Sequence, residues 1–360
     1  MSDSSLTSAA RSPYPDAPAA LSNGMNLIVS PIGADSDLRV ALEDLKMGRH
    51  LAARDLLIRT GHNWSLLAKR CQLLLSDPGA LGVIKTWRDE EPHSRQASVL
   101  WARALTQGAL QLHREGKAAD VVCRAAGMAD KEWKWAEALW PESPEPWNGR
   151  LQLTRLPCDP WVFDPYWGRR KDPWDRLNDV EMHFSGPWPL WAEANWRDPG
   201  NRDAHHRMRE YFLSHNGAGP AFQYTQWTVS GHGLHAELLL LPLYALMDVY
   251  RERHGRGQRG ALGFWQTEQV HHFAMRAFQE WFSVIPPAEY PWLSNWDLNH
   301  LAHALVACGA TGPAKRVFGA LGPYVTPQPW KDINDSLGRS QNWTDEFLRI
   351  RRAVLKQGAR

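Results

Sequence analysis

The spacing of apolar residues along the chain predicts an all-α fold. From Asp37 onward, apolar side chains recur three and four positions apart, as in LRVALEDLKMGRHLAARDLLIRTG. This period places them on one face of an α-helix. Gly48 separates two short helices in this stretch and Gly61 ends the second. No stretch of the sequence shows a clear alternation of apolar and polar residues, which is the pattern of a half-buried strand. We therefore expect a chain built from helices.

The same pattern fills the second half of the chain. A helix is predicted over 202–215, followed by a Gly/Asn stop, an aromatic segment and a longer apolar helix over 231–250. Further helices are predicted over 264–282, 296–308 and 313–321. The last helix begins at Thr344, with acidic residues in its first turn and basic residues later, an order that complements the helix dipole.

Residues 157–200 interrupt this helical spacing of apolar residues. Prolines break the helical pattern here, and the segment is crowded with tryptophan, tyrosine and phenylalanine. A flexible linker is instead rich in glycine and serine and poor in aromatic residues. We therefore predict a packed Trp/Pro-rich connector over 157–200. It joins an N-terminal helical half (25–156) to a C-terminal one (201–360), behind a disordered tail (1–24).

The spacing of small residues resembles that of the tetratricopeptide family, whose helix pairs place a glycine at the end of the first helix and an alanine about five positions later. Gly48 and Ala53 fit this spacing, Gly309 and Ala314 fit it again, and Gly116 keeps the glycine. The segments WPESPEPW and WRDPGNRDAH resemble the proline-containing turns between repeats. The resemblance implies an α-solenoid with a concave face for partners.

A second similarity is carried by RDPGNRDAHHRM and the glycine-containing loop and apolar helix that follow it. These features are similar to a tetratricopeptide-like family of high-GC soil bacteria. That resemblance implies a helical superhelix and no assigned activity.

Composition narrows the class of protein. The 360 residues carry a formal net charge of +2, which gives no overall attraction to nucleic acid or an anionic membrane. The longest apolar run, Leu238–Met247, is too short to cross a bilayer, so we expect no membrane partner. The cysteines show no disulfide-like spacing and predict a reducing, cytoplasmic location. They are Cys71, Cys123, Cys158 and Cys308. Cys71, Cys123 and Cys308 are interpreted as core residues.

The 20 tryptophans favour a recognition protein as the leading interpretation. Aromatic rings in the connector, with Arg169, Arg170 and Lys171 between them, are suited to lining a groove for a protein, a peptide or a small apolar ligand. Packing between the two helical halves is the structural alternative for the same rings. The groove interpretation requires no cofactor. Its candidate anchors are Trp161, Tyr166, Trp167 and Trp174.

Carboxylate-x-x-His pairs suggest a second hypothesis, a metal-dependent oxidase or oxygenase of bacterial specialised metabolism. Residues three apart share a helix face, and di-iron bundles present their ligands in this way. Iron or another transition metal would be the cofactor. Histidines bonded to neighbouring groups across helix contacts are the structural alternative. The candidate ligands are Asp203, His206, Glu237, Glu268, His271, Asp297 and His300.

A third hypothesis, nucleic-acid contact, rests on the arginines between Arg251 and Arg259. The segment GRGQRG within this stretch matches the dinucleotide-binding sequence motif GxGxxG. It follows an apolar helix, whereas that motif requires a strand before it. We interpret the segment as a solvated loop and rank nucleic acid last among the partners.

Overall fold

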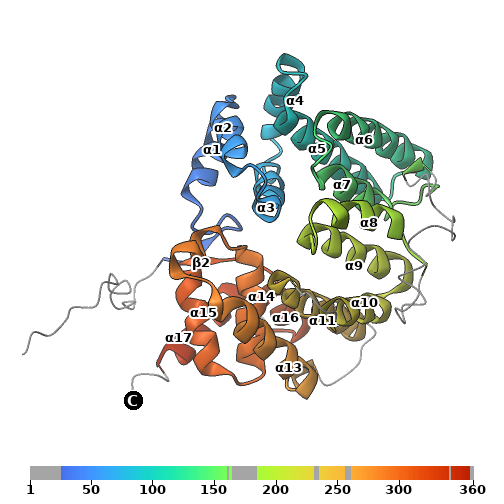
Figure 1. The fold of residues 1–360 in the computed structure, drawn as a ribbon. Helices are drawn as coiled ribbons and strands as arrows, with labels where there is room; N and C mark the ends of the chain where they lie inside the picture. Colours follow the sequence, from blue (N-terminus) through green and yellow to red (C-terminus); the bar gives the residue numbers. More distant parts are fainter. Residues whose placement is uncertain are drawn as a thin grey trace, which may run out of the picture.

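The computed structural model is almost entirely helical (Figure 1). Within its described residues, the regular elements other than helices are two-residue strands, β1 (Ile28–Val29) and β2 (Tyr324–Val325). The predicted all-α class is therefore confirmed. The structure describes residues 26–159, 162–163, 185–230, 235–255, 261–339 and 342–356.

Seven helices form the first part of the chain. Asp35, Asn63 and Ser94 each accept a main-chain N–H with their side chains and so fix where three of these helices begin. The helices are α1 (Ser36–Lys46), α2 (Leu51–Thr60), α3 (Trp64–Leu74), α4 (Ala80–Glu90), α5 (Arg95–Arg114), α6 (Ala119–Leu139) and α7 (Glu145–Leu153).

The second part contains more helices than the sequence predicted. Helices α8, α10 and α16 were not foreseen, and the aromatic segment expected before residue 231 is helical. Short 3-10 and π turns, η3 to η6, connect or extend the α-helices. The α-helices are α8 (Trp188–Arg197), α9 (Arg202–Asn216), α10 (Ala218–Ser230), α11 (Leu241–Gly255), α12 (Ala261–Trp265), α13 (Glu268–Arg276), α14 (Asn295–Ala307), α15 (Thr311–Leu321), α16 (Trp330–Ser336) and α17 (Trp343–Lys356). The short turns are η3 (Ala236–Leu240), η4 (Ala277–Trp281), η5 (Phe282–Val284) and η6 (Pro287–Trp292).

Glycine turns at two predicted positions fold consecutive helices against each other. Gly48 follows α1 with φ of 80°, and Gly309 follows α14 with φ of 82°. Both values lie in the left-handed region, where glycine has no steric penalty. The helices on either side of each turn pack together, α1 on α2 and α14 on α15. Helix pairs are therefore present at both places, while membership of the tetratricopeptide family stays a prediction.

Many tryptophans belong to the hydrophobic core. Trp133 of α6 is fully buried, and a Cβ placed on Gly149 of α7 would lie only 2.0 Å from its ring. This glycine lets α7 pack directly on the indole. Part of the tryptophan excess is thus explained by packing. The buried tryptophans among the described residues are Trp64, Trp87, Trp133, Trp140, Trp147, Trp191, Trp265, Trp281 and Trp330.

The two ends of the helical array meet, which the sequence did not predict. Figure 1 shows the first helices beside β2 and α14, so the array curves round on itself. Strand β1 pairs in parallel with β2, and Asn295 Nδ2 donates to the carbonyl of Ser30 at 2.7 Å. Lys69 Nζ of α3 donates to the carbonyls of Trp292 and Leu293 at 2.9 and 3.0 Å. These contacts close the chain into a ring.

The cysteine prediction was wrong for one pair. Cys123 of α6 forms a disulfide with Cys158, which follows α7, and their Cα atoms lie 5.5 Å apart. Cys123 is therefore not an isolated core thiol, and the cysteine argument for a reducing compartment no longer holds. Cys71 is buried as predicted, and burial raises the pKa of its thiol to about 12. Cys308 is half-buried.

None of the described helices combines the length and the apolar character that a membrane span requires. The cytoplasmic location stays a prediction.

Candidate functional site

A polar cavity of about 250 Å³ lies where α3, α9, α11 and α14 meet. Helix α3 belongs to the first part of the chain and the other three to the second, so ring closure completes its wall (Figure 1). The cavity is lined by Ala68, Lys69, Gln72, Arg202, Asp203, His206, Arg207, Arg209, Glu210, Tyr244, Asp248, Arg251, Ser294, Trp296, His300 and Gln328.

Basic side chains outnumber acidic ones in this lining. Five are basic and three are acidic. The basic residues are Lys69, Arg202, Arg207, Arg209 and Arg251, and the acidic residues are Asp203, Glu210 and Asp248. Charges in a partly buried pocket interact more strongly than on an open surface because less water screens them. The cavity is therefore suited to a negatively charged molecule.

Most of the arginines are held in place by carboxylates. Arg202 pairs with Asp297, and Arg209 pairs with Asp248. Arg251 donates to Asp248 at 3.2 Å and also pairs with Asp332 of α16. In the described structure, Nε of Arg202, Arg207 and Arg209 is buried without a hydrogen-bond acceptor. Ion pairs thus fix the orientation of these arginines, and Arg202, Arg207 and Arg209 each keep one N–H donor that is not bonded in the described structure.

Lys69 differs from the arginines because no described carboxylate lies within ion-pair distance of its Nζ. Its bonds go to the two main-chain carbonyls described above. Burial lowers the pKa of Lys69 to about 8, with Arg70 and Arg202 acting in the same direction and Asp35 and Asp297 opposing it. Lys69 contributes a cationic group whose charge the protein has not neutralised.

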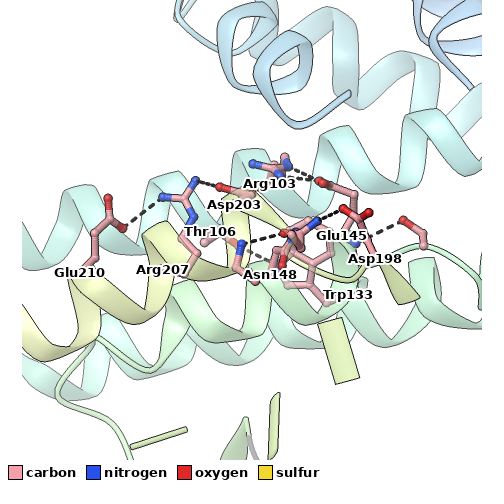
Figure 2. Close-up of polar contacts among 12 residues, drawn as sticks. Arg103, Thr106, Trp133, Glu145, Asn148, Asp198, Asp203, Arg207 and Glu210 are labelled. Atoms are coloured by element: carbon pink, nitrogen blue, oxygen red, sulfur yellow. Dashed lines mark hydrogen bonds and ion pairs between the residues drawn. The ribbon is translucent and has the colours of Figure 1, made fainter. Parts of the chain in front are cut away.

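A series of buried ion pairs joins α9, which forms part of the cavity wall, to the helices behind it (Figure 2). Arg103 of α5 donates to Glu145 of α7 at 2.6 Å and to Asp203 at 2.7 Å. Arg207 continues the series from Asp203 at 2.9 Å to Glu210 at 3.1 Å. Three helices are thereby joined behind the cavity, which fixes where α9 presents its polar side chains.

The two acids that share Arg103 have opposite pKa shifts. Burial raises the pKa of Glu145, which Arg103 offsets only in part. Burial also acts to raise the pKa of Asp203, but Arg207 and Arg103 outweigh it and hold the value at about 2. Asp203 is therefore ionised at neutral pH, and its charge is paired with Arg103 and Arg207.

Tyr244 of α11 holds two histidines at the cavity. The ring of His206 meets it edge-on with centroids 4.8 Å apart, and the ring of His300 stacks on it at 4.0 Å. Tyr244 also donates its hydroxyl to Asp297 at 2.6 Å. Burial lowers the pKa of His300 to about 3 and that of His206 well below its usual range. Both rings are neutral at pH 7.

The structure brings four of the seven candidate metal ligands to this region. Asp203, His206 and His300 line the cavity, and Asp297 is bonded to Tyr244 and Arg202. The two carboxylates are bound by arginines rather than turned toward the histidines.

The other three candidate ligands lie elsewhere. Glu237 accepts a hydrogen bond from Ser65 at 2.6 Å, and Glu268 and His271 are exposed on α13. Among the described residues, no group of three or more His, Cys, Asp or Glu side chains could hold a metal ion.

The aromatic anchors cannot be placed in this geometry. Trp161, Tyr166, Trp167 and Trp174 lie outside the described residues, as do residues 256–260 of the arginine-rich loop.

Sequence reasoning missed four of the basic residues that line the cavity, Lys69, Arg202, Arg207 and Arg209, and the aromatic Tyr244, and it assigned Arg251 to nucleic-acid contact instead. A signal existed in RDAHHRMREYF, where Ala204, Met208 and Phe212 form one apolar face of a predicted helix and five charged residues occupy much of the rest. A helix with so wide a charged face that also lies among apolar helices must bury some of its charged groups. Buried charges are paired or functional.

Neither a protein-family model nor a curated protein matches the chain.

Proposed function

We propose that the protein is a tetratricopeptide-like binding protein that holds a small oxyanion, such as a carboxylate or a phosphate, in the cavity between α3, α9, α11 and α14. The observation that carries this proposal is the excess of basic over acidic side chains in the cavity lining. Planar guanidinium groups match carboxylate and phosphate oxygens in geometry as well as in charge.

The dimensions of the cavity favour a small molecule over a protein or peptide partner. Pockets for drug-sized ligands usually measure about 300–1,000 Å³. The cavity of about 250 Å³ lies below that range. Its ligand is accordingly a molecule of few heavy atoms, with Tyr244 and Trp296 available for a flat or apolar portion.

Preorganisation supports the same proposal. The carboxylates that pair with Arg202, Arg209 and Arg251 fix these side chains before any ligand arrives. Fixed donors lose little conformational entropy on binding. Lys69 and the neutral His206 add groups without a counter-ion, and His206 Nε2 has no hydrogen-bond partner in the described structure.

Thermal unfolding with a panel of small anions tests the proposal. Acetate, malonate and inorganic phosphate are compared with chloride at equal ionic strength. A ligand at about 100 times its Kd stabilises the native state by about 2.7 kcal/mol and raises Tm accordingly. We expect at least one oxyanion to raise Tm well beyond the effect of chloride.

Two arginine variants locate the effect. Arg251→Gln removes a cavity charge from a side chain that is 44% exposed, so folding should tolerate it. Arg349→Gln makes the same change on α17, where the side chain is 65% exposed and is not part of the cavity lining. The stabilisation should shrink in Arg251→Gln and persist in Arg349→Gln. Equal shifts in both variants, or no shift beyond that of chloride, would contradict the proposal.

A further inference from the structure

We propose that Lys69 is a reactive amine and that the ligand of the cavity is an oxyanion which also carries an aldehyde or ketone group, bound through a Schiff base. This inference rests on the proposed function and adds the chemical class of the ligand and a covalent step. It starts from the place of Lys69 in the cavity lining and from the hydrogen bonds of its amine.

The hydrogen bonds of Lys69 suit a neutral amine. A neutral amine has two N–H donors and one lone pair, whereas an ammonium group has three donors. Nζ makes two bonds, to the carbonyls of Trp292 and Leu293 at 2.9 and 3.0 Å. Among the described residues no third acceptor is bonded to it. Two carbonyls fully satisfy the neutral form and leave the lone pair available in a side chain that lines the cavity.

Burial of Lys69 favours the same form and outweighs the two nearby acids. Arg70 and Arg202 disfavour a further positive charge, and the acids that oppose them, Asp35 and Asp297, are committed to other partners. Asp35 is bonded to Arg70 at 3.1 Å, and Asp297 to Arg202 and Tyr244. The histidines of the lining are neutral and add no charge. With a pKa of about 8, roughly a tenth of Lys69 is unprotonated at pH 7.

The same lining positions a carbonyl compound. The cavity arginines bind the anionic end, which holds the carbonyl carbon within a space of about 250 Å³ whose lining includes Lys69. Such confinement converts a bimolecular reaction into an effectively intramolecular one. A lysine with a depressed pKa is the usual nucleophile for Schiff-base formation.

The reaction balances without any oxidant or reductant. The lone pair of Nζ attacks the carbonyl carbon, a C–N bond forms, and the carbonyl electron pair moves to oxygen, which takes a proton. The nitrogen then loses its protons as the C–O bond breaks. One water molecule leaves, and the product is a C=N bond between Lys69 and the ligand.

Reductive trapping on the full-length protein tests the inference. The probe is glyoxylate, which combines a carboxylate with an aldehyde, in the presence of cyanoborohydride at pH 7. Peptide mapping then measures the rate at which each lysine gains a carboxymethyl group. Lys117, which is exposed, serves as the internal reference. Lys69 should react at least about tenfold faster, because far more of it is unprotonated at this pH.

Three controls make the outcome decisive. Acetaldehyde, which lacks the carboxylate, should show a smaller preference for Lys69 than glyoxylate does, because only the lowered pKa of Lys69 then favours it. Acetate should slow the reaction of Lys69 with glyoxylate and leave Lys117 unchanged. The variant Lys69→Arg keeps donors for the two carbonyls and should fold and give no trapped adduct at position 69.

The inference would be overturned if Lys69 reacted no faster than Lys117, or if acetaldehyde matched glyoxylate at Lys69. Its failure is distinct from failure of the proposed function. Oxyanions without a carbonyl would still raise Tm in a manner sensitive to Arg251→Gln if only the covalent step were wrong.

Discussion

Arg103 donates to Glu145 across 2.6 Å between two helices, and neither side chain is more than 6% exposed. The same guanidinium reaches Asp203 on the cavity wall. The position of the site therefore depends on a charge in the first half of the chain. Removing one partner from a buried ion pair leaves an uncompensated charge, which is more costly than losing the attraction alone.

We predict that Arg103→Leu lowers the free energy of unfolding by about 3–5 kcal/mol, because Glu145 and Asp203 lose their shared cation. Urea denaturation measures the change. Arg95→Leu on the same helix breaks an exposed pair with Glu142 and should cost at most about 1 kcal/mol. Similar losses in the two variants would show that the buried network does not support the fold as described.

Gly149 provides a test of helix packing. In Gly149→Ala the new methyl group would lie 2.0 Å from the ring of Trp133, so the helices must separate or the indole must move. We expect a loss of about 3 kcal/mol in unfolding free energy. Gly127→Ala on α6 meets nothing within 4 Å and should stabilise by a few tenths to about 1 kcal/mol through helix propensity. Destabilisation by both variants would argue against a specific contact at Gly149.

Buried histidines predict a loss of stability in acid. Burial lowers the pKa of His303 to about 4, compared with about 6.5 in an unfolded chain. Below pH 6.5 the unfolded chain binds a proton that the native protein does not, so stability falls as pH falls toward 4. The stability that this shift contributes is fully present above pH 6.5. Between pH 6.5 and 4 it falls by about 1.4 kcal/mol per pH unit.

The variant His303→Gln should therefore lose stability less steeply between pH 6 and 4. The ring of His303 meets those of Trp265 and Trp330, so the variant is less stable at pH 8 as well, and the comparison is made on slopes. Denaturant titrations between pH 6 and 4 give the slope of unfolding free energy against pH for each protein. Parallel curves for wild type and variant would mean that His303 titrates normally in the native state.

The disulfide between Cys123 and Cys158 gives a fourth prediction. Mapping of unreduced protein should recover the two peptides linked, with Cys71 and Cys308 as thiols. The bond spans 35 residues, and loop-closure entropy predicts a stability loss of about 4 kcal/mol on reduction. The double variant Cys123→Ala/Cys158→Ala should reproduce this loss and no longer respond to reductant. Unlinked peptides from protein isolated under oxidising conditions would refute the pairing.

Local signals in the sequence were enough to predict the helix pairs. Gly48 and Gly309 mark turns because few other residues tolerate a positive φ. Helix α10 was missed because its sequence opens with glycines and Pro220, which usually end helices. Pro220 lies in the first turn of α10, where its missing N–H breaks no helical bond.

The candidate site was only partly predictable. The spacing of Asp203 and His206, and of Asp297 and His300, correctly indicated polar faces on two helices. Whether such a carboxylate binds a metal or an arginine depends on partners distant in sequence. Arg103 reaches Asp203 across 100 positions, and Arg202 reaches Asp297 across 95. Ring closure is equally non-local, since β1 pairs with a strand near the other end of the chain.

A crystal structure grown with the most stabilising oxyanion tests the central claim most directly. The account predicts the anion within the cavity, with its oxygens at hydrogen-bond distance from at least two of Lys69, Arg202, Arg209 and Arg251. An anion bound only on the outer surface, with the cavity unchanged by its presence, would contradict the account.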